Sequence, residues 1–221
     1  MKIQAINSGI NFNQKADLSN KRIYLLTNSD KFTSETGFFN AIEDSIQGGV
    51  DCIQFREKNM PDDKMISLGA KLKRLCEKYN VPFIVDDKIK VAKVLNADGI
   101  HLGQNDESAV FARKELGEDA VIGISAPNPK AALKAVAEGA DYIGVGPVFK
   151  TPLKDEPVVG MNYLRWVVKN IKLPIFAIGG INMSNIDEVL STGIKQFCFI
   201  RTIINNENPK KAAETYLKKL I

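Results

Sequence analysis

Several charged and polar side chains follow short apolar runs that have the composition of β-strands. Gln54, Arg56 and Lys58 alternate at the end of one such run, so an extended backbone places all three on one face. Asp87 follows the next run, and Asp106 lies shortly after the one beyond it. Magnesium takes one or two carboxylates, keeps several waters and bridges substrate phosphates. Two cations and two carboxylates therefore predict a magnesium-assisted site for a diphosphate.

Each of these residues also has a simpler interpretation. Arg56 and Lys58 are solvated charges if they only mark the end of a strand, and Asp is a good cap where a strand leads into a helix. The combination favours the functional interpretation, because Gln54 shares a face with both cations and because the two carboxylates follow neighbouring strands.

A second group of residues has the composition of a metal-free phosphate site. Gly179 and Gly180 end a later apolar run, and Ile200 and Arg201 end the last one. Glycines let backbone N–H groups approach phosphate oxygens, a following helix adds a favourable dipole, and arginine adds a fork of donors. Gly-Gly also makes tight turns, which is the alternative interpretation. Together the two sites predict two phosphorylated substrates, one with a diphosphate leaving group and one with a plain phosphate.

The elements that position these residues alternate along the chain. Segments of helical period, such as 62–79, 129–138 and 209–220, separate eight short runs that read as strands. The predicted strands span residues 23–27, 50–56, 82–85, 99–102, 120–124, 142–146, 175–178 and 196–200. Eight such units without a Pro/Ser-rich linker predict an α/β fold, a single (β/α)₈ TIM barrel domain over residues 1–221, in which residues 1–20 precede the first strand. A doubly wound open sheet is the alternative.

A weak internal repeat supports the barrel. Near the start of every second predicted strand, a small residue or glycine is followed by an acid or a lysine. These charged residues are Asp51, Asp98, Asp141 and Lys195, and such a recurrence is expected when a barrel is built from four similar units. In such a barrel the single histidine, His101, faces inward, where a hydrogen-bonded core residue is more common than a proton donor.

Composition narrows the classes of partner. The 221 residues carry a net charge of +4, and acidic residues interleave the basic ones, which favours small anionic ligands over nucleic acid. Three cysteines, Cys52, Cys76 and Cys198, are an odd number, lie far apart in the sequence and lack C-x-x-C spacing, so neither a disulfide framework nor a zinc site is supported. The N-terminal stretch lacks the apolar core of a signal peptide, and no run is long enough to span a membrane. We therefore expect a cytoplasmic protein with no membrane partner; the sequence leaves a homo-oligomer open.

The motifs together resemble the thiamine-phosphate synthase family, also called thiamine-phosphate pyrophosphorylases. The stretches that carry the resemblance cover most of the chain, and their combination is specific: they are 54–58 (QFREK), 98–106 (DGIHLGQND), 123–126 (GISA), 139–154 and 177–181 (AIGGI). The resemblance implies a magnesium-dependent barrel enzyme that joins hydroxymethylpyrimidine diphosphate to thiazole phosphate, giving thiamine phosphate and pyrophosphate.

The resemblance also implies a role for each matching residue. Asp87 and Asp106 would bind Mg²⁺, and Arg56, Lys58 and Lys154 would contact the pyrophosphate. Gln54 and Ser125 would hold the pyrimidine. The thiazole phosphate would lie against Thr151, Gly180, Ile200 and Arg201. Gly179 belongs to the same turn as Gly180. The family chemistry is dissociative, so these groups neutralise charge and orient substrates without a general base.

Three positions depart from the family pattern. Asp86 stands where Asn is usual, adding a negative charge that is either a third metal ligand or an impediment to diphosphate binding. Leu153 stands in place of a second Thr, and Arg201 in place of a Ser. Two other hypotheses therefore stay open beside the synthase: a thiazole tautomerase of the same superfamily, and a non-catalytic sensor of a thiamine precursor.

Overall fold

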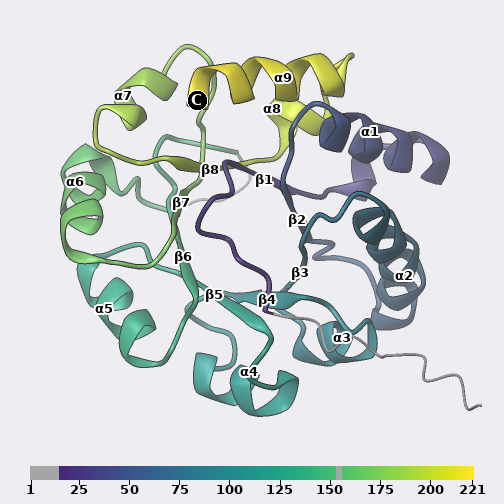
Figure 1. Ribbon diagram of the computed structural model, residues 1–221, viewed down its shortest axis with the longest axis horizontal. Helices are drawn as coiled ribbons and strands as arrows, with labels where there is room; N and C mark the ends of the chain where they lie inside the picture. The colour runs from purple at the N-terminus through teal and green to yellow at the C-terminus, as the bar shows by residue number, and fades with distance from the viewer. Residues whose placement is uncertain (1–14, 153–155) are drawn as a thin grey trace, which may run out of the picture.

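Eight parallel strands close into a barrel in the computed structural model, which describes residues 15–152 and 156–221. The strands follow one another around the ring in chain order, and β1 pairs with β8 (Figure 1). They are β1 (Ile23–Leu26), β2 (Cys52–Phe55), β3 (Phe83–Asp86), β4 (Gly99–Leu102), β5 (Val121–Ser125), β6 (Tyr142–Val145), β7 (Ile175–Ala177) and β8 (Gln196–Phe199). The predicted TIM barrel is confirmed, and the open sheet is wrong because no strand of this ring has an unpaired edge.

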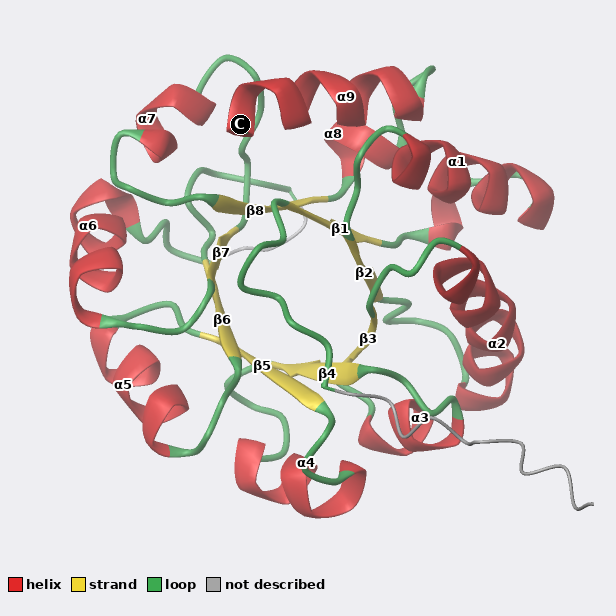
Figure 2. Ribbon diagram, viewed as in Figure 1, coloured by secondary structure: helices red, strands yellow, loops and turns green. Residues whose placement is uncertain are grey.

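The helices form a ring outside the strands (Figure 2). They are α1 (Glu35–Gln47), α2 (Asp62–Lys78), α3 (Ile89–Val94), α4 (Ala109–Leu116), α5 (Pro129–Ala137), α6 (Gly160–Asn170), α7 (Ile186–Leu190), α8 (Arg201–Ile204) and α9 (Pro209–Leu220), with a 3-10 helix, η1 (Ser29–Lys31), after β1. The residues at the start of α5 show how the sequence begins a helix. The Asn128 side chain caps it by accepting a hydrogen bond from the Ala131 N–H at 3.0 Å, and Pro129 occupies its first turn. The three helices predicted from periodicity agree with α2, α5 and α9 to within one residue.

The apolar side chains form two layers. The larger cluster lies between the strands and the helices, and the smaller one fills the barrel interior. The buried interior residues are Leu18, Tyr24, Leu26, Cys52, Ile84, Val121, Tyr142, Phe176 and Cys198. The alternation of strand side chains sends every second residue into this interior, which therefore holds no channel and leaves the strand ends as the places for a site.

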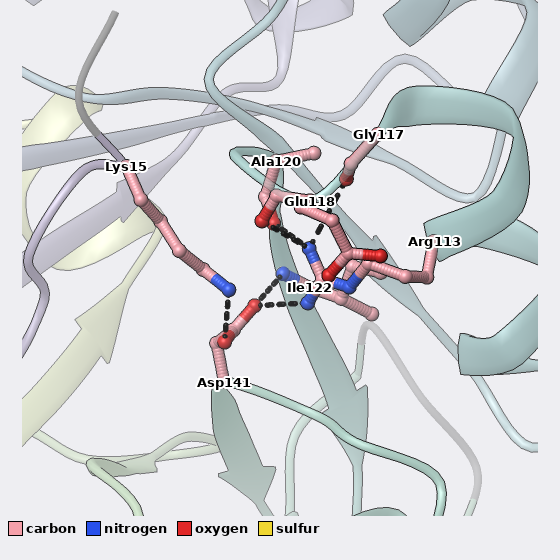
Figure 3. Close-up of polar contacts among 7 residues, drawn as sticks. All are labelled: Lys15, Arg113, Gly117, Glu118, Ala120, Ile122 and Asp141. Carbon is pink, nitrogen blue, oxygen red and sulfur yellow. Dashed lines mark hydrogen bonds and ion pairs between the residues drawn. The ribbon is translucent and has the colours of Figure 1, made fainter.

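The segment before β1 crosses the end of the barrel at which the strands begin (Figure 2). Leu18 is buried there, and its carbonyl oxygen accepts a hydrogen bond from Gln196 Nε2 at 2.7 Å. Lys15 Nζ lies 2.6 Å from Asp141, which Arg113 also contacts at 2.7 Å (Figure 3). This end of the barrel is thus closed by the chain itself. None of the helices in the described ranges is long and apolar enough to cross a membrane.

Candidate active site

The two predicted cations lie at the opposite end of the barrel, after the last residue of β2. Gln54 is buried in the interior, and Arg56 and Lys58 follow on the same face, whereas Phe55 packs outward against Phe83. Arg56 Nε lies 3.5 Å from Asp86 Oδ2, and Lys58 Nζ lies 3.9 Å from Asp87 Oδ2. The alternation therefore placed these side chains correctly, and the barrel brings them to the carboxylates of the neighbouring strand.

Three carboxylates gather beside these cations, and two of them have shifted pKa values. Burial, followed by the charge of Asp87, raises the pKa of Asp86. Burial also raises the pKa of Asp87, and the neighbouring Asp106 carboxylate raises it further. Both shifts mean that negative charges are held close together at this end of the barrel. A divalent cation bound between the carboxylates would offset their repulsion.

The backbone holds Asp87 and Asp106 in place. Asp87 has a left-handed φ of 60°, a conformation that Asp tolerates better than most residues, and its N–H donates to the His101 carbonyl oxygen at 2.9 Å. Asp106 accepts a hydrogen bond from the Gly103 N–H at 2.6 Å. Neither carboxylate caps one of the assigned helices, since Lys88 and Ser108 occupy the N-cap positions of α3 and α4. The helix-cap interpretation of these two residues is therefore not supported.

The donor set fits Mg²⁺. Asp87 and Asp106 offer hard oxygen ligands close enough to influence each other's charge, and magnesium needs only one or two carboxylates when phosphate and water complete its shell. The described part of the chain holds no group of three or more His, Cys, Asp or Glu side chains arranged around one metal. Asp86 is paired with Arg56 instead, which disfavours the hypothesis that it is a third ligand.

Sequence reasoning missed Glu57, which lies between the two cations. Its carboxylate is buried and accepts hydrogen bonds from Thr27 Oγ1 at 2.7 Å and from the N–H and hydroxyl of Ser29 at 3.0 and 2.6 Å. Thr27 Oγ1 also accepts the Arg56 N–H at 2.9 Å. These bonds tie the end of β1 to the end of β2. The signal was present in the alternation, because a charge on the outward face beside Phe55 must be buried and needs donors.

The pyrimidine residues expected from the resemblance lie on β2 and β5, three strands apart in the ring. Gln54 Nε2 donates to Tyr24 at 3.1 Å, and Ser125 Oγ lies 3.0 Å from His101 Nε2. His101 Nδ1 in turn lies 3.0 Å from the Tyr142 hydroxyl. His101 is therefore an interior, hydrogen-bonded residue, as its register predicts.

The glycine turn after β7 packs against the loop after β6. Gly179 and Gly180 have φ values of 100° and 68°, and a Cβ on Gly180 would lie 2.8 Å from the Lys150 carbonyl oxygen. Phe149 N–H donates to the Gly179 carbonyl oxygen at 2.9 Å. The structure thus gives these glycines a packing role and brings them next to the segment that contains Thr151.

The remaining residues of the second anion site stand at the start of α8. Ile200 precedes α8, and Arg201 is its exposed first residue. Among the described residues no side chain caps the start of α8, so the N–H groups of its first turn stand beside Arg201, as the phosphate hypothesis requires. The predicted ligand Lys154 and the departure Leu153 lie outside the described residues.

Residues 23–203 match the family model described as thiamine monophosphate synthase, so the match covers most of the chain. The chain belongs to the thiamine-phosphate synthase family. It is 42% identical over 198 residues to the thiamine-phosphate synthase of Methanobrevibacter smithii, covering 89% of this chain and 94% of that protein. It is 41% identical over 199 residues to the thiamine-phosphate synthase of Clostridium novyi, covering 89% of this chain and 97% of that protein. The predicted family is confirmed, as are the enzyme class, a transferase, and the type of activity, thiamine-phosphate synthase.

A solved structure of the thiamine-phosphate synthase family has the same arrangement. The thiamine phosphate pyrophosphorylase of Pyrococcus furiosus superimposes with a TM-score of 0.81 at 35% identity, covering 91% of this chain and 96% of that one. A more distant barrel, KGPDC from Streptococcus mutans, superimposes with a TM-score of 0.71 at 14% identity over 90% of this chain and 97% of that one, a likeness of fold alone.

Proposed function

We propose that this chain joins 4-amino-2-methyl-5-hydroxymethylpyrimidine diphosphate to 4-methyl-5-(2-phosphoethyl)thiazole, releasing pyrophosphate and forming thiamine phosphate. The observation that carries the proposal is the meeting of Arg56 and Lys58 with Asp86 and Asp87 at the ends of β2 and β3. Cations and paired carboxylates in one place suit a polyanionic leaving group held with a metal. Membership of the synthase family supports the same reaction.

The diphosphate would bind between the cations and the carboxylate pair. Asp87 and Asp106 would hold Mg²⁺, which when bound neutralises charge on the diphosphate oxygens. Arg56 offers a planar fork of donors and Lys58 a mobile point charge, and Lys154 would add a third cation. Gln54 and Ser125 would hold the pyrimidine ring below this group.

The thiazole phosphate would bind on the far side of the same mouth. N–H groups at Gly180, Ile200 and Arg201 would donate to its oxygens, with Gly179 shaping the turn and Thr151 nearby. The Arg201 guanidinium adds a charge that the usual serine lacks, and it compensates for the hydroxyl absent at Leu153.

In this reaction the residues supply charge neutralisation and orientation. The C–O bond of the pyrimidine methylene breaks, and its electron pair leaves with pyrophosphate, giving a pyrimidine carbocation. The lone pair of the thiazole nitrogen then forms the new C–N bond. No proton moves in either step, so the site needs no general base, and Arg56 and Lys58 act where negative charge develops. The three buried thiols, Cys52, Cys76 and Cys198, are in keeping with the cytoplasmic location expected from the sequence.

An assay of product formation tests the proposal. Purified protein is incubated with both substrates and Mg²⁺, and thiamine phosphate is detected by oxidation to a fluorescent thiochrome. We expect product that disappears when a chelator removes the metal. Asp87→Asn and Asp106→Asn should each abolish turnover, because each removes a metal ligand, whereas the exposed neighbour Glu107→Gln should retain it.

Other outcomes of this assay point to other functions. In a separate incubation with a non-aromatic tautomer of thiazole phosphate, conversion to the aromatic form together with no condensation would identify a thiazole tautomerase. Calorimetric binding of thiazole phosphate without any turnover would identify a sensor. Turnover that survives both Asp variants would overturn the metal assignment while leaving the synthase reaction in place.

A further inference from the structure

A row of hydrogen-bonded side chains crosses the barrel interior from Gln54 to Ser125. Gln54 Nε2 lies 3.1 Å from the Tyr24 hydroxyl, which lies 2.9 Å from the Tyr142 hydroxyl. Tyr142 lies 3.0 Å from His101 Nδ1, and His101 Nε2 lies 3.0 Å from Ser125 Oγ. The row therefore joins the two residues that the proposed function assigns to the pyrimidine.

Glycines make the space for this row. A Cβ on Gly123 would lie 2.0 Å from the Tyr142 ring, and one on Gly144 would lie 3.1 Å from the His101 ring. Tyr24 and Tyr142 are fully buried, and Ser125 at the far end is partly exposed. The neighbouring strands are thus shaped around the row. Ser125 ends the row at the end of β5, and the buried Gln54 ends it one residue before the end of β2.

The row has a direction that follows from hydrogen-bond chemistry. The Gln54 amide nitrogen can only donate, so the Tyr24 hydroxyl accepts from it. Geometry alone allows either direction between the two tyrosines, and either tautomer of His101. Only one order gives each tyrosine hydrogen an acceptor within the row: Tyr24 donates to Tyr142, and Tyr142 donates to Nδ1 of His101. The histidine proton then lies on Nε2, toward Ser125. Burial raises the pKa of both tyrosines well above its ordinary value, so both phenols keep the hydrogen that the row requires.

The direction decides what the ends offer to a ligand. Because Tyr24 engages the amide nitrogen of Gln54, the group that this end offers to a ligand is the amide carbonyl oxygen, which is an acceptor. Ser125 Oγ accepts from His101, so its own hydrogen is available for donation. One end of the row thus accepts a hydrogen bond, and the other donates one.

We propose that Tyr24, Tyr142 and His101 are positioning residues that set this direction, so that the site selects a 4-aminopyrimidine over a 4-oxopyrimidine. This inference rests on the proposed function. A 4-aminopyrimidine carries an amino donor for Gln54 and a ring nitrogen acceptor for Ser125. A 4-oxopyrimidine with a protonated ring nitrogen reverses both, and a site built to hydrogen-bond one pattern rejects the other because its own groups are left unpaired.

Competition between two diphosphates tests the inference. The ratio of kcat/KM for the 4-amino substrate to that for its 4-oxo analogue is measured for the wild-type protein and for Tyr142→Phe and Tyr24→Phe. We expect the ratio to fall about 10-fold or more in either variant, the equivalent of losing one oriented buried hydrogen bond. KM for thiazole phosphate should stay unchanged. The matched control is Tyr216→Phe, a buried tyrosine of α9 outside the row.

The single histidine allows a second measurement that needs no turnover. With ¹⁵N-labelled histidine and no added tag, the signals belong to His101 alone. We expect the Nε2-protonated tautomer in the wild-type protein and a mixture of tautomers in Tyr142→Phe. A wild-type Nδ1-protonated ring would show that the row runs the other way and would overturn the inference. An unchanged substrate ratio in a turnover-competent Tyr142→Phe would do the same, whereas a wild-type protein without any turnover would overturn the proposed function.

Discussion

At the scale of single residues, Asp86 places a buried negative charge beside the cation that is proposed to bind diphosphate. Arg56 pairs with it at 3.5 Å, so substrate must compete with Asp86 for the guanidinium. Asp86→Asn keeps the shape and removes the charge. We expect KM for the pyrimidine diphosphate to fall about fivefold, for a repulsion of about 1 kcal/mol between partly screened charges.

Initial-rate kinetics at saturating thiazole phosphate and Mg²⁺ measure this change. The exposed Asp119→Asn is the control, because it removes the same charge far from the mouth. A rise in KM for Asp86→Asn would mean that Asp86 is needed to hold Arg56 in its binding position.

Glu57 and Thr27 act on the same cations indirectly. Thr27 Oγ1 donates to Glu57 and accepts the Arg56 N–H, so Thr27→Val deletes both bonds at nearly constant volume. The substitution leaves the buried Glu57 carboxylate and the Arg56 N–H each without one hydrogen-bond partner. We therefore expect the free energy of unfolding, measured by urea titration, to fall by about 1–3 kcal/mol. KM for the diphosphate should rise while KM for thiazole phosphate stays the same.

The matched variant Thr27→Ser keeps the hydroxyl and should restore the diphosphate KM. A purely structural role for Thr27 would lower the fraction of folded enzyme without separating the two KM values. Equal changes for both substrates would therefore remove Glu57 and Thr27 from the positioning of the diphosphate site.

At the scale of elements, the internal repeat has a structural cause. Asp51, Asp98 and Asp141 each precede an even-numbered strand and accept the N–H of the strand before it, at Ile23, Phe83 and Ile122 respectively, over 2.8–2.9 Å. In the fourth unit Gln196 Oε1 accepts the Ile175 N–H at 3.0 Å, so Gln196 rather than the aligned Lys195 has this role. The repeat therefore arises because one side chain in each unit hydrogen-bonds two neighbouring strands together at the end where they begin.

Asp98→Ala tests this role. It leaves the Phe83 N–H without its acceptor, and we expect the free energy of unfolding to fall by about 1–3 kcal/mol in a urea titration. Asp98→Asn retains a carbonyl acceptor and should lose less. Asp119→Ala, in an exposed turn, should change the free energy of unfolding little. An equally small change for Asp98→Ala would show that the hydrogen bond between Asp98 and the Phe83 N–H does not stabilise the barrel.

At the scale of the whole molecule, the barrel separates stability from chemistry. The segment around Leu18 closes the end where strands begin, and the cations and carboxylates stand at the end where strands finish. We expect Leu18→Ala to lower the free energy of unfolding by about 2 kcal/mol, because it leaves a cavity under the inner cluster. KM for both substrates should be unchanged, whereas Ser19→Ala, in the exposed part of the segment, should affect neither quantity. A changed KM in Leu18→Ala would show that the two ends of the barrel are coupled.

Local patterns alone determined where the eight strands lie and the face on which the strand-end charges lie. Alternation placed Gln54, Arg56 and Lys58 on one side, and periodicity located the three helices α2, α5 and α9, because both signals depend on neighbours a few residues apart. The long-range contacts were decided only by closure of the barrel. Tyr24 meets Tyr142 across 118 residues, and Glu57 meets Thr27 across 30. A hydrogen bond of that kind depends on which strands become neighbours and in what register, which no local pattern encodes.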